Sequence, residues 1–158
     1  MTSRIMIVGG PGSGKTTLAH RLTLLTGLPT YSVDDAVRDG MGVQRADADI
    51  DSIVRGWAQE DRWIIEGGNT RTYEDRALRA DLIIRMAPPV LLRLLRVLRR
   101  DGFNLRLLQW TLGYDAVFGG KDRAICGGQH VVLRNARDIE HLIGQLKLAA
   151  SPIANTLT

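Results

Sequence analysis

The sequence is poor in cysteine and histidine, and each shortage excludes a class of site. Its 158 residues contain one cysteine, Cys126, so the chain offers neither an internal disulfide nor a cysteine metal cluster. We expect Cys126 to be a small packing residue. The histidines, His20, His130 and His141, are scattered and lack the spacing of metal ligands, which argues against a zinc site.

Long hydrophobic runs are missing as well. The apolar stretch at residues 82–98 is interrupted by Arg85, Arg93 and Arg96, so nothing approaches the roughly 20 apolar residues of a membrane-spanning helix. The first expected strand begins at Arg4, which leaves no room for a signal peptide. We therefore expect a cytoplasmic protein with no membrane partner.

Lysine is also scarce, because arginine supplies 18 of the 21 basic residues. Residues 34–66 hold nine acids and four bases, whereas residues 67–137 hold six acids and thirteen bases. A guanidinium group binds phosphate or carboxylate oxygens two at a time. The basic half is therefore suited to a nucleotide or a nucleic acid, and the alternative is a solvated surface that keeps the protein soluble.

The composition, 44% hydrophobic and 24% charged, is that of an ordinary globular protein. We expect one domain over residues 1–158, with a frayed tail at 149–158. Short β-rich runs alternate with helical patterns, which predicts an α/β protein with a parallel sheet covered on both faces. Strands are expected at 4–8, 30–33, 63–66, 82–86 and 130–133, and helices at 15–26, 47–60, 89–100 and 135–148.

The most informative motif is a glycine-rich loop after the first expected strand. It has the spacing G-x-x-x-x-G-K-T, and its residues are Gly9, Gly10, Pro11, Gly12, Ser13, Gly14, Lys15, Thr16 and Thr17. Glycines reach positive φ without strain and let backbone N–H groups surround a polyphosphate, and the helix that follows adds its positive end. The loop therefore predicts a nucleotide-binding site. The alternative is an incidental glycine-rich turn.

Three side chains of this loop have separate expected roles. Lys15 reaches the outer phosphates of a bound triphosphate. Thr16 offers a hydroxyl for one position around Mg²⁺, whose other ligands are phosphate oxygens and water. Thr17 adds a further hydroxyl contact. The expected cofactors are therefore Mg²⁺ and ATP, with GTP as the alternative nucleotide.

Acidic residues follow the second and third expected strands. Because ligands of open parallel sheets lie beyond the carboxyl ends of the strands, we expect Asp34, Asp35 and Glu66 to face the cleft of the loop. A carboxylate there can hold a Mg²⁺-bound water or accept the proton of an attacking hydroxyl. The alternatives are a helix N-cap for Asp34 or Asp35 and backbone hydrogen bonding for Glu66. Arg71 is a candidate clamp for the acceptor, or else an ion-pair partner of Glu66.

The helix expected at 89–100 carries leucines and arginines together. Its buried stripe is expected to consist of Leu91, Leu94, Leu95 and Leu98. The flanking basic residues are Arg93, Arg96, Arg99 and Arg100. They either face a phosphate-bearing cleft or form a solvated basic surface.

The order of these motifs resembles the P-loop nucleoside and nucleotide kinase superfamily. GGPGSGKTT is similar to the loop of adenylate kinases. YSVDD, RWIIEGGNTRT, RADLIIRM and the RLLRVLRR helix are similar to the adenylate-kinase-like proteins called DNA topology modulation proteins. Over residues 4–146 the resemblance implies a three-layer, adenylate-kinase-like fold with a five-stranded parallel sheet. It further implies a mobile acceptor-side segment near 35–62 and a lid near 100–125.

The resemblance also implies roles for individual residues. Asp34 is the better match to the family aspartate, and Asp35 is its neighbour. The residues matched to the acceptor side are Asp34, Asp35, Glu66, Gly67, Arg71 and Arg76. Those expected to be catalytic are Lys15, Asp34, Arg96, Arg100 and Arg123, with Arg99 also on the lid side. The lid is shortened, and Glu66 stands where the family usually has aspartate, yet both departures leave nucleotide binding intact.

These features predict an ATP- and Mg²⁺-dependent phosphotransferase that acts on a small nucleotide-like or hydroxyl-bearing acceptor. One alternative is a nucleotide-binding regulator that touches DNA, which the basic half and the family label support. However, the helix that carries its arginines has few aromatics, and the sequence has no recognised DNA-binding motif. A slow P-loop ATPase without an acceptor is the third possibility and fits the shortened lid.

Overall fold

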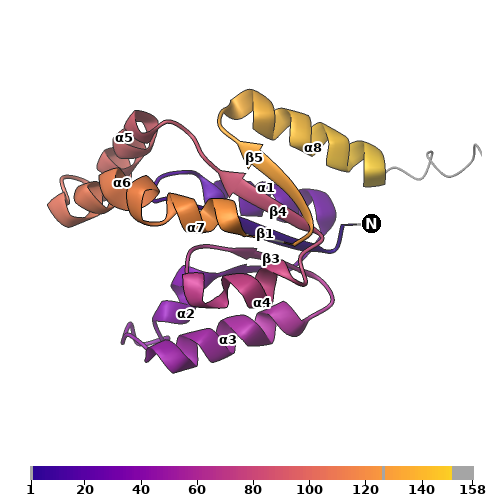
Figure 1. The fold of residues 1–158 in the computed structure, drawn as a ribbon, viewed down its shortest axis with the longest axis horizontal. Helices are drawn as coiled ribbons and strands as arrows, with labels where there is room; N and C mark the ends of the chain where they lie inside the picture. The colour runs from indigo at the N-terminus through magenta and orange to yellow at the C-terminus, as the bar shows by residue number, and fades with distance from the viewer. Residues whose placement is uncertain (1, 126, 151–158) are drawn as a thin grey trace, which may run out of the picture.

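The computed structural model describes residues 2–125 and 127–150, so Cys126 and the end of the expected tail lie outside the described residues. Five parallel strands form one sheet in the order β2-β3-β1-β4-β5 (Figure 1). They are β1 (Arg4–Gly9), β2 (Thr30–Ser32), β3 (Trp63–Glu66), β4 (Leu82–Met86) and β5 (Gln129–Leu133). The predicted α/β fold with a five-stranded parallel sheet is confirmed.

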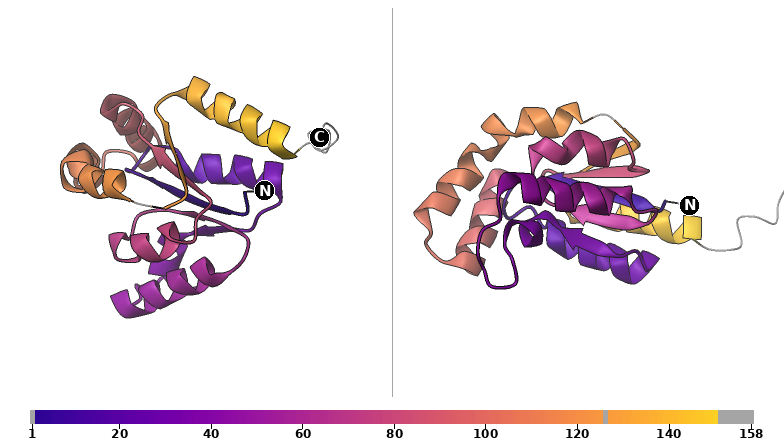
Figure 2. Two further views of the ribbon diagram at one scale, coloured as in Figure 1. Left: turned by 45° about the vertical axis from the view of Figure 1, so that its right-hand side comes forward. Right: turned by 90° about the horizontal axis from the view of Figure 1, so that it is seen from below.

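Helices connect the strands and cover the sheet. They are α1 (Lys15–Thr26), α2 (Val33–Val37), α3 (Asp47–Gln59), the 3₁₀ turn η1 (Thr70–Thr72), α4 (Tyr73–Ala77), α5 (Val90–Asp101), α6 (Leu105–Val117), α7 (Gly119–Ala124) and α8 (Ala136–Ala150). The views show α1 and α8 on one face of the sheet and α3 and α4 on the other (Figures 1 and 2). Within the described part of the chain, no helix combines the length and apolarity needed to cross a membrane.

Alternation along β1 builds the two halves of the core. Ile5 and Ile7 pack against α1 and α8, whereas Met6 and Val8 pack toward α3 and α4, and all four are fully buried. Successive side chains of a strand point to opposite faces, so a central parallel strand must be apolar on both. This arrangement fixes β1 in the middle of the sheet and sets the loop that follows it at the sheet's carboxyl edge.

The prediction for the buried face of α5 is wrong. Leu91, Leu95 and Leu98 are 67%, 57% and 43% exposed, whereas Arg93 and Val97 are buried. The buried face lies against the glycine loop, where a Cβ added to Gly12 would come within 2.5 Å of the Arg93 carbonyl oxygen. Periodicity identified an apolar stripe, but the neighbour of this helix is a loop backbone that packs against Arg93 and Val97, while Arg96, Arg99 and Arg100 stay exposed.

The second expected strand is also shorter than predicted. Its last residue is Ser32, and Val33 begins α2. The short helices α2 and α4 and the turn η1 span less than two helical turns each, too few residues for a helical period to be recognised.

Asp81 joins the beginnings of β1 and β4. Its carboxylate accepts hydrogen bonds from the backbone N–H groups of Ser3 (2.8 Å) and Arg4 (3.0 Å) and pairs with the Arg4 guanidinium at 2.8 Å. Burial acts to raise the pKa of Asp81, but these hydrogen bonds outweigh it, and the pKa lies below its usual value of 3.8. The folded state therefore prefers the ionised form, so this stabilisation is present above pH 3.8 and is lost as the pH falls through the folded-state pKa.

We expect Asp81→Asn to lower the free energy of unfolding at pH 7 by about 1–3 kcal/mol. The difference from the wild type should shrink as the pH falls from about 4 through the folded-state pKa, because below that pKa the carboxyl group is protonated in both the folded and unfolded states. Urea unfolding at a series of pH values measures it. Asp61→Asn is the control, since that side chain is fully exposed and lies 4.0 Å from Arg79. A pH-independent difference for Asp81→Asn would contradict this account.

Candidate functional site

A cleft of about 610 Å³ lies at the carboxyl edge of the sheet. Its floor is the P-loop, which we define as residues 9–17. The described residues that line it outside this loop are Asp34, Gly68, Asn69, Arg96, Arg100, Leu107, Trp110 and Tyr114. The cleft therefore brings together α2, the loop after β3, α5 and α6, elements far apart in the sequence.

Two glycines let the P-loop pass between its neighbours. Gly9 has φ 144°, and a Cβ there would lie 2.4 Å from the Met86 carbonyl oxygen. Gly12 has φ 69° and is pressed against α5 in the same way. Within the P-loop, Gly14 is the N-cap of α1, and as a glycine it has no side chain to cap the helix. The first N–H groups of α1 thus remain available to an anion.

Lys15 lies over this loop with its charge partly removed from water. Its Nζ donates a hydrogen bond to the Gly10 carbonyl oxygen at 3.2 Å. Burial lowers the pKa of Lys15, and the carboxylates of Glu66 and Asp34 partly oppose that shift. No ion pair to Lys15 occurs among the described residues. An anionic ligand would supply the missing counter-charge.

Glu66 is a buried carboxylate at the end of β3. Its Oε1 accepts hydrogen bonds from the hydroxyls of Thr16 (3.0 Å) and Ser32 (2.9 Å). It therefore contacts side-chain hydroxyls and not Arg71. A hydroxyl beside a buried carboxylate fits Mg²⁺, which uses few protein ligands and keeps water or phosphate oxygens. Within the described ranges, no cluster of three or more His, Cys, Asp or Glu side chains could hold a metal ion.

Asp34 and Asp35 lie in the first turn of α2, after the N-cap residue Ser32. The N-cap alternative for these aspartates therefore does not apply. Both are exposed, and Asp34 lines the cleft whereas Asp35 does not. The structure thus separates two neighbouring acids that the sequence left together.

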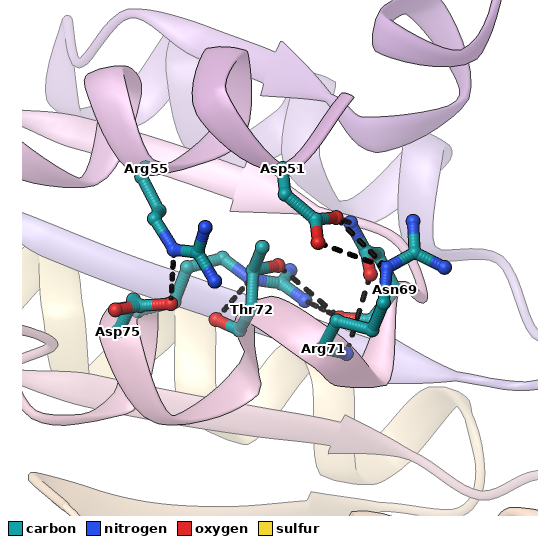
Figure 3. Close-up of polar contacts among 7 residues, drawn as sticks. Asp51, Arg55, Asn69, Arg71, Thr72 and Asp75 are labelled. Carbon is teal, nitrogen blue, oxygen red and sulfur yellow. Dashed lines mark hydrogen bonds and ion pairs between the residues drawn. The ribbon is translucent and has the colours of Figure 1, made fainter. Parts of the chain in front are cut away.

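Arg71 and Arg76 lie outside the cleft lining. Arg71 pairs with two aspartates of α3. Its Nε lies 2.9 Å from Asp51 Oδ2 (Figure 3), and its Nη1 lies 3.2 Å from Asp47 Oδ2. Arg76 is fully buried, and burial lowers its pKa to about 10. Its guanidinium donates to the carbonyl oxygens of three consecutive loop residues, Gly67 (3.1 Å), Gly68 (2.5 Å) and Asn69 (3.1 Å). Arg76 therefore braces the loop after β3.

Of the three arginines predicted to be catalytic on the lid side, two line the cleft and one does not. Arg96 donates to the carbonyl oxygens of Gly12 and Ser13, both at 3.3 Å, and lines the cleft. Arg100 also lines the cleft and pairs with Asp101 at 2.8 Å. Arg123 is exposed on α7, and it does not line the cleft.

Comparison with known proteins gives structural matches only. No protein-family model matches the chain, and no curated protein matches it. A shikimate kinase from Acinetobacter baumannii in complex with shikimate has a TM-score of 0.69 at 16% identity, over 100% of this chain and 97% of its own. A sugar kinase from Janibacter sp. has a TM-score of 0.62 at 23% identity, over 99% and 100%. The protein has the P-loop kinase fold.

Another match within this fold is a gluconokinase from Sinorhizobium meliloti, with a TM-score of 0.57 at 15% identity, over 95% of this chain and 98% of its own. At these identities the structures show the fold alone. They give no support to the narrower group of DNA topology modulation proteins or to a nucleic-acid partner.

The P-loop kinase fold here contains polar side chains that sequence reasoning missed. Arg93 is buried and forms an ion pair with Asp115, and both its guanidinium and the Tyr114 ring lie against Gly10. The Tyr114 hydroxyl donates to Asp122 at 3.1 Å, and the Tyr73 hydroxyl donates to the same carboxylate at 2.8 Å. Burial, together with Asp122, raises the pKa of both tyrosines. Arg93 is the exception, since it is among the basic residues expected on its helix, but no spacing in the sequence links the other residues to it.

Proposed function

We propose that the protein transfers the γ-phosphoryl group of ATP to a hydroxyl group of a small acceptor. The observation that carries this proposal is the composition of the cleft, in which a P-loop with Lys15 faces Asp34 and is flanked by Arg96 and Arg100. The structural neighbours are described as a shikimate kinase, a sugar kinase and a gluconokinase, which supports the same class of reaction.

The triphosphate lies along the P-loop, where N–H groups at the start of α1 and the Lys15 ammonium receive its oxygens. The base fits a second hollow of about 500 Å³ beside the loop. Its apolar wall includes Met86, Leu92 and Ile139, and Asn135 offers a polar group. Ser13 and Arg96 line this hollow, and Arg96 also lines the cleft, so one ligand can span both.

Thr16 and Glu66 are the residues that would hold Mg²⁺, Thr16 directly and Glu66 through water. When bound, Mg²⁺ supplies positive charge that neutralises and orients the phosphate oxygens. The buried position of Glu66 and its hydrogen bond to Thr16 keep this pair in one orientation.

The transfer itself needs positioning more than covalent chemistry. Asp34 accepts the proton of the acceptor hydroxyl as its oxygen forms a bond to the γ-phosphorus. The bond between that phosphorus and the bridging oxygen breaks, and ADP leaves. Lys15, Arg96 and Arg100 stabilise the negative charge on the transferring group. Arg123 has no role in this proposal because it does not line the cleft.

Titration calorimetry with Mg²⁺ and ATP or GTP tests the nucleotide site, and ADP release in the presence of nucleosides, nucleotides and polyols tests the transfer. We expect MgATP binding and ADP release that depends on an acceptor. ADP release equal with and without every acceptor would support a simple ATPase instead.

Asp34→Asn is expected to lower kcat by about 10²- to 10⁴-fold, because an amide cannot accept the acceptor proton. MgATP affinity should stay within about twofold, since Asp34 only faces the far end of the triphosphate. Steady-state kinetics and calorimetry measure the two effects. Asp35→Asn is the matched control, because Asp35 belongs to the same helical turn but does not line the cleft. Equal kcat values for the two variants would remove Asp34 from the reaction.

A further inference from the structure

The two walls of the cleft differ in charge. The wall formed by the P-loop and α5 carries Lys15, Arg96 and Arg100. The lining residues that come from α2 and from the loop after β3, which we call the acceptor wall, are Asp34, Gly68 and Asn69. Among the described residues, no arginine or lysine of the acceptor wall lines the cleft.

The arginine closest in sequence to the acceptor wall is Arg71, and its charge is already matched. Asp51 is only 8% exposed, and its carboxylate receives both the Arg71 Nε (2.9 Å) and the Asn69 Nδ2 (2.9 Å). These hydrogen bonds hold the pKa of Asp51 below its usual value. Asp47 adds a second carboxylate to the same guanidinium. The cluster thus contains two negative charges and one positive charge.

Three other arginines of this side are occupied in similar ways. Arg76 is buried beneath the loop and donates to three of its carbonyl oxygens. Arg55 pairs with Asp75 at 2.9 Å (Figure 3). Arg45 donates to the Ala36 carbonyl oxygen at 3.0 Å. None of these guanidinium groups lines the cleft, so the acceptor wall presents a carboxylate, an amide and backbone.

We infer that the acceptor is a polyhydroxyl compound that bears no phosphate or carboxylate group, an inference that rests on the proposed transfer to a hydroxyl. An anionic group on the acceptor would meet Asp34, and the cations that line the same cleft, Lys15, Arg96 and Arg100, are those that the proposed reaction assigns to the triphosphate. Hydroxyl groups instead suit a carboxylate and backbone groups. Trp110 lines the same cleft and offers a flat apolar surface to the C–H face of such a compound.

Matched pairs that differ by one anionic group test this inference on the full chain. The pairs are sorbitol with gluconate and adenosine with AMP. Binding is measured by titration calorimetry in the presence of Mg²⁺ and a non-hydrolysable ATP analogue, and kcat/KM is measured with ATP. We expect the neutral member of a pair to be favoured by at least about tenfold in both measurements.

A preference for the anionic member, or binding of no neutral member, overturns the inference. Failure of the proposed function has a different signature, because MgATP itself would then give no binding heat. The calorimetric arm therefore separates the two failures.

Charge variants around Arg71 provide the second test. Asp47→Asn removes an exposed carboxylate from the Arg71 guanidinium, so less of the Arg71 charge is neutralised. The kcat/KM of the neutral acceptor divided by that of the anionic acceptor should therefore fall by at least about threefold. Asp75→Asn is the matched control, since it releases Arg55 away from the cleft and should leave the ratio unchanged. Arg71→Gln should change kcat/KM for the neutral acceptor by less than about threefold. A loss of about a hundredfold for the anionic acceptor in Arg71→Gln, with the neutral one unaffected, would assign Arg71 to an acceptor anion and refute the inference.

Discussion

Lys15→Ala is expected to reduce phosphoryl transfer by about a thousandfold, because the ammonium is the cation inside the P-loop that meets charge developing on the γ-phosphoryl group. The effect should appear in kcat and in MgATP affinity, since the ammonium also faces the ground-state phosphates. ADP release and titration calorimetry measure the two quantities.

The same substitution should leave the fold at least as stable as the wild type. Burial lowers the pKa of Lys15, which means that the folded state disfavours its charged form relative to the unfolded chain. Below the folded-state pKa the lysine charge therefore costs stability, and alanine relieves that cost. Thermal unfolding at pH 7 checks this. Lys147→Ala, on the exposed side of α8, is the control for activity. Unchanged turnover and nucleotide affinity in Lys15→Ala would refute the assignment of the loop.

Gly12→Ala is expected to destabilise the protein by about 3 kcal/mol and to abolish nucleotide binding. A non-glycine residue at φ 69° costs about 1–2 kcal/mol, and overpacking adds about 1–3 kcal/mol. The new methyl group would lie 2.5 Å from the Arg93 carbonyl oxygen and 3.0 Å from Val97 Cγ2, so α5 must move away from the P-loop. Because Arg93 contributes backbone at this contact, a change of rotamer cannot relieve it.

Gly144→Ala is the matched control for this experiment. No atom lies within 4 Å of a Cβ added at Gly144 in α8, and alanine should stabilise that helix by about 0.5–1 kcal/mol. Urea unfolding and MgATP calorimetry compare the two variants. If Gly12→Ala matched the wild type in both, the close packing of α5 on the loop would be disproved.

The sheet and its main helices could be predicted from the sequence because their signals are local. The runs that form β3 and β4 are short, apolar and bounded by charged or turn residues, and α1 begins at the loop and ends at Gly27. The face that α5 buries could not be predicted in the same way. A leucine stripe states which side of a helix is apolar, but only the tertiary structure shows that the opposite side lies against glycine backbone.

The candidate site likewise contains residues that local sequence signals predict and residues that they do not. The P-loop, Asp34 and Glu66 follow from strand ends in a parallel sheet, and all of them lie at its carboxyl edge. The partner of Arg71 could not be found this way. Asn69 turns the chain with φ 60°, and the aspartates that receive Arg71 come from α3, whose position no local pattern specifies.

The packing of α5 on the P-loop also fixes the position of one cation of the proposed site. Arg96 lies about one turn along from Arg93, and its hydrogen bonds to the Gly12 and Ser13 carbonyl oxygens hold its guanidinium group beside the P-loop. The entropy cost of ordering the Arg96 side chain is therefore met during folding. In the proposed reaction it would not add to the cost of binding the nucleotide. In the proposed reaction, a nucleotide would therefore meet a guanidinium group that the loop backbone already positions.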